Sequence, residues 1–245
     1  KGTELFEACR NAALSFNPVP GNGHTPMPIC YARLGLAEHL AGILDEWVDS
    51  FQIFSQGLFC YFRRDYQKAY KDGNRPDPDS ASEHKIPALT NDVRVMFSDP
   101  EEHIGLPRRP FAHMALEAGS VLETTINEML LQSYNGKIRV FPAVPDDWAC
   151  RFTLDAQGGF VVTSERADGK VQYVAIESLK GQPCCLVNPW GPQEKVQVRL
   201  AGSEDVLLEV EDAAVVRFAT KAGNTYVVER VASPVSSFGR EAIGG

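Results

Sequence analysis

A carboxylate beside a predicted helix start is the first feature of the sequence that could do chemistry. Glu117 lies just ahead of Ser120-Val-Leu-Glu123, a capping-box pattern that predicts the beginning of a helix. Free backbone N–H groups and the positive end of the helix dipole hold a nearby carboxylate ionised and oriented. An ionised, oriented carboxylate is suited to act as a general base. The other interpretation is that Glu117 only complements the helix dipole.

Three ring-bearing side chains near Glu117 are candidate substrate-binding residues. Phe111 and His113 precede it in the same segment, and Trp148 follows at the expected junction between helices and strands. Sugar rings bury their C–H faces against aromatic rings while their hydroxyls find polar partners. The alternatives are that Trp148 is a packing residue at that junction and that His113 is a hydrogen-bonded loop histidine.

Helices are expected to position these candidate site residues, because helical periodicity dominates the sequence up to about residue 135. Apolar residues recur at helical spacing and predict helices over 3–15, 29–48 and 121–134. Asn135-Gly136 ends the last of them. The chain between 70 and 110 is polar and rich in proline, which indicates a long connection.

Beyond the last predicted helix the apolar period changes to two, which predicts strands. Strand-like segments are 152–156, 160–163, 171–176, 196–200, 206–210, 215–218 and 226–228. Ala167-Asp-Gly-Lys170 predicts the turn between the second and third of these segments. Helices followed by antiparallel strands predict an α+β chain that ends in a β-sandwich and a flexible tail over 233–245.

The motif Asn188-Pro-Trp-Gly191 predicts a turn between strands. Asn and Pro favour turns, and Gly191 permits a positive φ. We expect Trp190 to cover one end of the sandwich. A surface platform for glycans is the alternative.

Composition excludes several classes of protein. A hydrophobic share of 44% with 23% charged residues is typical of a globular chain. The net charge of −8 gives no basic excess for nucleic acid or an anionic membrane, and no apolar run approaches the roughly 18–20 residues of a membrane span. The six cysteines are too sparse for a disulfide scaffold and form no C-x-x-C pair, so we expect buried thiols. The histidines lack ligand spacing, so we expect neither a metal nor a cofactor.

Several motifs in a fixed order carry a resemblance to a known family. They are Glu128-Met-Leu-Leu-Gln-Ser133, Gly136–Pro145, Trp148, Gly158-Gly-Phe160 and Asn188–Gly191. This order resembles the end of the catalytic barrel in glycoside hydrolase family 95, where "EMLLQS", "LLPALP", a Trp and "GGF" follow one another. The resemblance implies an (α/α)6 barrel followed by a C-terminal β-domain, and hydrolysis of α-L-fucosides or related galactosides with inversion.

On this resemblance the chain divides into three parts. Residues 1–135 would be the last helices of an incomplete (α/α)6 toroid, 136–232 a β-sandwich domain and 233–245 a flexible tail. The resemblance also implies an α-L-fucosidase-like enzyme with a carbohydrate substrate and an extracellular or periplasmic location.

The register of the helix motif sets Glu117 where the family has an aspartate of its base machinery, in "DGNFGG". This chain departs from that pattern, with a carboxylate one methylene longer and Gly119 in place of the asparagine. The family's acid glutamate would precede Lys1, so we treat the chain as a fragment that is inactive alone. Its expected partner is the missing N-terminal part of the same protein. A non-catalytic carbohydrate-binding or structural module is the alternative, in which the strands only buttress the barrel.

Overall fold

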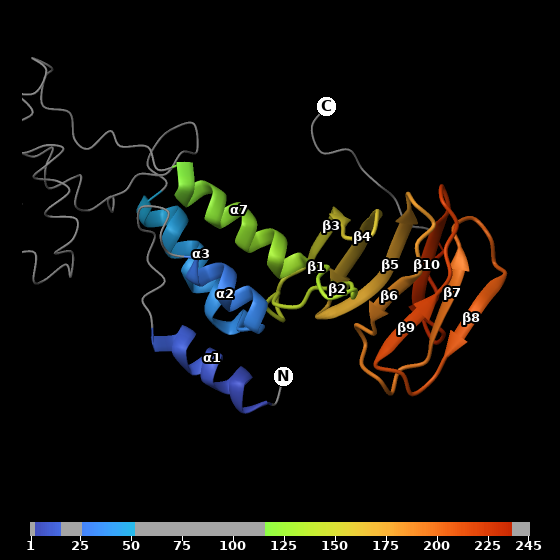
Figure 1. Cartoon of the computed structure of the whole chain (residues 1–245), viewed down its shortest axis with the longest axis horizontal. Helices are drawn as coiled ribbons and strands as arrows, with labels where there is room; N and C mark the ends of the chain where they lie inside the picture. Colours follow the sequence, from blue (N-terminus) through green and yellow to red (C-terminus); the bar gives the residue numbers. More distant parts are fainter. Residues whose placement is uncertain (1–2, 16–25, 52–115, 237–245) are drawn as a thin grey trace, which may run out of the picture. The chain divides into compact units, whose positions relative to one another are not determined.

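The computed structural model of the protein describes residues 3–15, 26–51 and 116–236 (Figure 1). Its helices are α1 (Glu4–Ser15), α2 (Met27–Leu34), α3 (Ala37–Phe51) and α7 (Leu116–Leu130). The strands are β1 (Leu131–Gln132), β2 (Arg139–Val140), β3 (Cys150–Ala156), β4 (Phe160–Ala167), β5 (Lys170–Ser178), β6 (Cys184–Val187), β7 (Val196–Leu200), β8 (Val206–Val210), β9 (Val215–Phe218) and β10 (Thr225–Arg230). The predicted α+β class with a C-terminal β-domain is confirmed. The barrel origin of the helices stays a prediction.

The chain forms two compact units. Within the described residues, one unit holds 3–15, 28–41 and 123–236, and the other holds 26–27, 42–51 and 116–122. All strands, α1 and nearly all of α2 belong to the first unit, which contains every contact discussed below. The predicted boundaries at 135 and 232 remain predictions.

The helix expected over 29–48 is two helices, so that prediction is wrong at its centre. Gly35 has a φ of 73° and ends α2, and its N–H donates to the Ala32 carbonyl at 3.1 Å. The N–H of Leu36 donates to the Tyr31 carbonyl at 3.0 Å, which completes a glycine-based C-terminal cap. The apolar period hides this break because Leu36 is itself buried.

The helix expected over 121–134 is displaced towards the N-terminus. It begins at Leu116 and ends at Leu130, and Leu131–Gln132 already form β1. Ser120 therefore lies inside α7 and does not cap its N-terminus, because the preceding turn also adopts helical geometry. Glu117 is the second residue of the helix, and its expected place in a loop ahead of the helix is wrong.

The strands form one large antiparallel sheet and two small ones. The large sheet has the order β3-β4-β5-β10-β7-β8, and β1–β2 and β6–β9 are separate two-stranded sheets. The seven predicted strands are confirmed, whereas β1, β2 and β6 were not predicted. β9 and β10 follow one another but belong to different sheets, so 221–224 does not close a hairpin.

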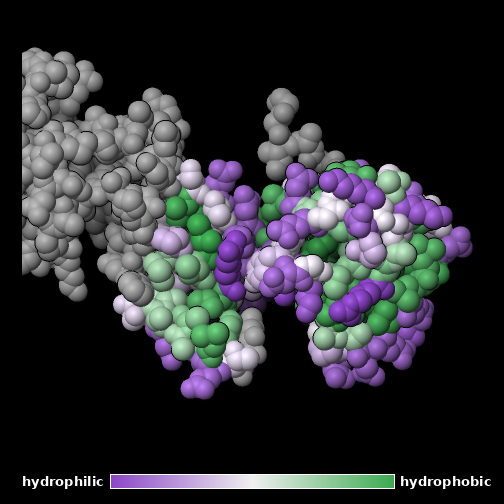
Figure 2. All heavy atoms as spheres, in the orientation of Figure 1, coloured by the Kyte–Doolittle hydropathy of each residue, from purple (hydrophilic) through white to green (hydrophobic). Residues whose placement is uncertain are grey.

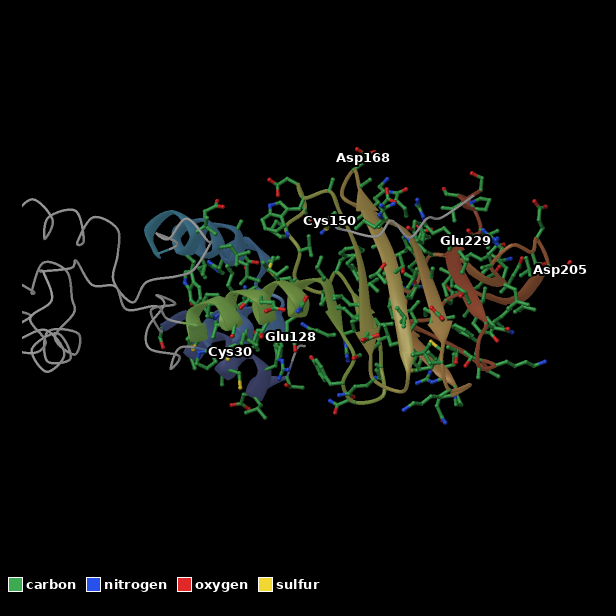
Figure 3. The ribbon with its side chains drawn as sticks, turned by 90° about the horizontal axis from the view of Figure 1, so that it is seen from above. Cys30, Glu128, Cys150, Asp168, Asp205 and Glu229 are labelled. Atoms are coloured by element: carbon green, nitrogen blue, oxygen red, sulfur yellow. The ribbon has the colours of Figure 1, made fainter. Side chains whose placement is uncertain are left out.

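The turn between β4 and β5 is the one that the sequence predicts. Asp168 and Gly169 have φ values of 51° and 69°, as a two-residue hairpin with positive φ at both positions requires. Figure 3 shows Asp168 at the tip of this hairpin. A register shift between Glu165 and Arg166 interrupts the ladder just before the turn. Irregularities of this kind redirect a side chain, and here they precede a buried arginine.

Two adjacent cysteines lie on β6, where successive side chains point to opposite faces. Cys184 is buried and Cys185 is half-buried, and every cysteine that the structure describes is a free thiol. The expectation of buried thiols is confirmed at Cys184 and wrong at Cys9, which is exposed. Burial raises the pKa of Cys184 to about 12, so this thiol is not a nucleophile at neutral pH.

The surface of the strand region mixes polar and apolar residues (Figure 2). Val206 and Leu207 on β8, an edge strand of the large sheet, are 44% and 53% exposed. Across the described part of the chain, none of the helices has the length and apolar character of a membrane span.

Candidate functional site

Among the predicted site residues, Trp148 is the one whose side chain the structure describes. Phe111 and His113 lie outside the described residues, as does the side chain of Glu117. Trp148 is half-buried, and its backbone N–H donates to the Pro145 carbonyl at 3.2 Å. The roles of these four residues therefore stay predictions.

Two pockets of nearly equal volume open beside the strands. The first, of about 490 Å³, we call the arginine pocket, and it is lined by Arg33, Gln132, Tyr134 and Arg139 among others. The second, of about 480 Å³, we call the tryptophan pocket, and its polar lining comprises Asp146, Arg166, Lys170, Trp190, Glu194 and Arg230. Val140, Pro142 and Pro189 line both, so the two pockets are neighbours, and Trp148 lines neither.

Residues of the motif Glu128–Ser133 build the arginine pocket. Glu128, which Figure 3 shows on α7, pairs with Arg33 of α2 at 2.7 Å. The side-chain amide of Gln132 donates to the Ala32 carbonyl at 3.1 Å and to the Glu128 carbonyl at 3.0 Å. These contacts hold the end of α7 against α2, so the motif stabilises the packing of these two helices.

Two arginine side chains of the arginine pocket lie against the ring of one tyrosine. The guanidinium carbons of Arg33 and Arg139 lie 5.8 and 5.0 Å from the centre of the Tyr134 ring, within cation–π range. The Tyr134 hydroxyl donates to the Gln132 side chain at 3.2 Å. The hydrogen bond to Glu128 raises the pKa of Arg33. Several polar groups of the arginine pocket are thus engaged with one another, whereas Nη1 of Arg139 and Oε2 of Glu128 are buried without a hydrogen-bond partner among the described residues.

Trp190 of the tryptophan pocket is held in a fixed orientation. Its indole N–H donates to the Val171 carbonyl at 2.6 Å, and its backbone N–H donates to Asn188 Oδ1 at 3.1 Å. Asn188 is buried and donates in turn to the Ala213 carbonyl at 3.1 Å. Gly191 adopts a φ of 96°. The predicted turn is therefore confirmed, and it positions an aromatic ring at a pocket wall.

Arg166 joins two loops at the same pocket. Its side chain is 8% exposed and donates to the carbonyls of Val144 and Pro145 at 2.8 and 3.1 Å. It also binds Asp146 at 2.7 Å and the Gly169 carbonyl at 3.3 Å. Because these hydrogen bonds use its donors, Arg166 shapes the tryptophan pocket and needs no ligand as a hydrogen-bond partner.

Three other charged side chains of the tryptophan pocket have hydrogen-bonding groups without a partner among the described residues. Within the described part of the chain, the side chains of Lys170 and Glu194 make neither a hydrogen bond nor an ion pair. The Nε atom of Arg230 is buried and lacks a hydrogen-bond partner there. Sequence reasoning missed all three. Only Trp190, in its turn motif, gave a signal.

A metal centre is not found in the residues that the structure describes, since they contain no group of three or more His, Cys, Asp or Glu side chains with suitable placement.

Comparison with known proteins assigns the strand region to a domain family. Residues 132–228 match the family model "Glycoside hydrolase family 95, C-terminal domain". The resemblance is thereby confirmed for residues 132–228. No curated protein matches the sequence.

A solved structure of a GH127 β-L-arabinofuranosidase from Geobacillus stearothermophilus T6 is also similar. It is 12% identical, with 86% of this chain and 32% of that chain covered, at a TM-score of 0.28. The chain thus spans about a third of that structure's length. A likeness at this level carries no weight for fold or function.

Proposed function

We propose that the chain is the C-terminal portion of an inverting glycoside hydrolase that acts on α-linked sugars of the fucoside or galactoside type. The supporting observation is the match of residues 132–228 to the C-terminal domain of glycoside hydrolase family 95. The helix that carries Glu117 ends at Leu130, two residues before that match begins. Glu117 therefore belongs to the element that leads directly into the domain.

In this proposal Glu117 is the base. An inverting hydrolase uses two carboxyl groups roughly 6.5–9.5 Å apart, so that water fits between the base and the sugar. Glu117 takes a proton from that water, whose oxygen attacks the anomeric carbon, while a second carboxylic acid protonates the departing oxygen. The first turn of α7 favours an ionised carboxylate because of the helix dipole. In this proposal the acid belongs to a part of the source protein outside these 245 residues, and Phe111, His113 and Trp148 contact the sugar.

The test is Glu117→Gln in the intact source protein. Loss of a general base lowers kcat by about 10²–10⁴-fold, and KM changes far less. Glu123→Gln is the matched control, because Glu123 is exposed on the same helix. Near-normal turnover by the Glu117 variant contradicts the base assignment. Measurable turnover by the 245-residue chain alone contradicts the placement of the acid.

A structural module is the second candidate, favoured by the contacts of Gln132 with Ala32 and Glu128. In this role the strand region stabilises the helices. We expect Gln132→Ala to accelerate proteolysis of the helical segments, since two hydrogen bonds to the helices and one from Tyr134 are lost, each of about 1 kcal/mol. Gln157→Ala is the matched control, because Gln157 is exposed and its backbone φ is not positive. Unchanged proteolysis of the Gln132 variant removes this candidate.

A further inference from the structure

We propose that the tryptophan pocket is a binding subsite for one sugar unit of a glycan, with a lining that does not include Glu117. The choice of a sugar as ligand rests on the proposed function. Binding at the pocket does not require that Glu117 be the base.

The pocket is preorganised for a small ligand. Its volume of about 480 Å³ falls in the range of about 300–1,000 Å³ that is typical of ligand sites. Trp190 cannot reorient without losing its hydrogen bonds to Val171 and Asn188, and Arg166 fixes the loops on the other side. A rigid wall loses little conformational entropy when a ligand binds.

The uncommitted groups match the chemistry of sugar hydroxyls. Glu194 offers only acceptors, and Lys170 and Arg230 offer only donors. A hydroxyl group donates and accepts at once, so adjacent hydroxyls of one ring satisfy both kinds of group. The buried Nε of Arg230 needs such a partner, because an unsatisfied buried donor costs about 1–3 kcal/mol. Trp190 supplies apolar surface for the C–H face of the ring.

The balance of charge favours a neutral polyol over an anion. Arg166 is paired with Asp146, and Glu194 offsets one of the two remaining cations. The lining therefore carries at most one excess positive charge, and its free carboxylate repels phosphate or sulfate. An anion site has converging cations with no competing carboxylate.

The experiment is an NMR titration of the ¹⁵N-labelled 245-residue chain with L-fucose, D-galactose, D-glucose and inorganic phosphate as separate probes. We expect at least one sugar to shift the amide signals of residues 188–194 and 169–171 in a saturable manner. Phosphate should leave these signals unchanged. Saturable shifts with phosphate alone, or no shift at these residues with any sugar, overturn the proposal.

Variants locate the binding. Glu194→Gln should weaken the sugar that binds by about tenfold or more, since it replaces a charged acceptor. Glu204→Gln, an exposed glutamate outside the pocket, should bind as the unchanged chain does. Equal affinity of the Glu194 and Glu204 variants overturns the proposal. Glu117→Gln should bind normally here even where it abolishes turnover in the intact protein, which separates this inference from the proposed function.

Discussion

Two neighbouring residues of β10 show how differently one strand can use its charged side chains. Glu229 and Arg230 are consecutive, so their side chains point to opposite faces of the sheet. Glu229 is fully buried and accepts hydrogen bonds from Arg199, Gln197 and the Val235 N–H. Arg230 lines the tryptophan pocket with its Nε unpartnered among the described residues. On this strand, the charged residue whose hydrogen bonds are satisfied belongs to the framework, and the one with an unsatisfied donor lies at the candidate binding surface.

The cluster around Glu229 also holds the chain beyond β10. Arg199 donates to Glu229 at 2.8 Å and to the Val235 carbonyl at 2.7 Å. Val235 packs against the buried Tyr173, Ala175 and Val227. The first residues of the expected tail are therefore attached to the sheet, and residues 237–245 lie outside the described part of the chain.

Removing the charged partner of Glu229 should have the largest effect on the free energy of unfolding. Arg199→Met leaves the fully buried Glu229 without its charged partner, which costs about 3–5 kcal/mol of unfolding free energy. Urea denaturation measures the change. Arg217→Met, at an exposed position on β9, is the control and should stay within about 0.5 kcal/mol. A loss below about 1 kcal/mol for Arg199→Met contradicts the framework role.

Protonation of Glu229 at low pH should have the second largest effect on the free energy of unfolding. Burial alone would raise the pKa of Glu229, but the hydrogen bonds from Arg199, Gln197 and Val235 outweigh it and lower the pKa below its ordinary 4.5. A lowered pKa stabilises the fold above that ordinary value, and the stabilisation disappears as the pH falls through the folded-state pKa. We expect the unfolding free energy to fall as the pH drops below about 4.5.

The variant Glu229→Gln isolates this titration. Its stability is lower at neutral pH, but it should decline less between about pH 5 and pH 3 than that of the unchanged chain, as followed by thermal unfolding. Glu204→Gln should keep the full decline. A Glu229 variant with the same acid response as the unchanged chain shows that other groups are responsible.

A substitution in the tryptophan pocket should have the smallest effect on the free energy of unfolding. Glu194→Gln removes a charge that has no partner among the described residues, so its unfolding free energy should change by no more than about 0.5 kcal/mol. Urea denaturation with Glu204→Gln as the control measures this. A loss above about 1 kcal/mol shows that Glu194 belongs to the framework, which would remove the contrast between the two faces of β10.

Local signals predicted much of the fold. The period-two segments gave strands with nearly the observed limits, and the Asp168-Gly169 turn and the positive φ of Gly191 follow from residue type alone. The errors lie where local signals conflict. The apolar period ran through Gly35, and Ser120 resembled a helix cap although its neighbours continue the helix.

The sequence by itself determined the class of the chain and its family resemblance, because periodicity, turn chemistry and motif order are properties of adjacent residues. Only the tertiary structure decided which charges are saturated. Arg166, Arg199, Glu229 and Arg230 are all charged residues in strand segments, and the ion pairs that three of them make join residues 20 and 30 positions apart. Whether such a group stabilises the fold or remains available depends on strand pairing between distant segments, which no local pattern specifies.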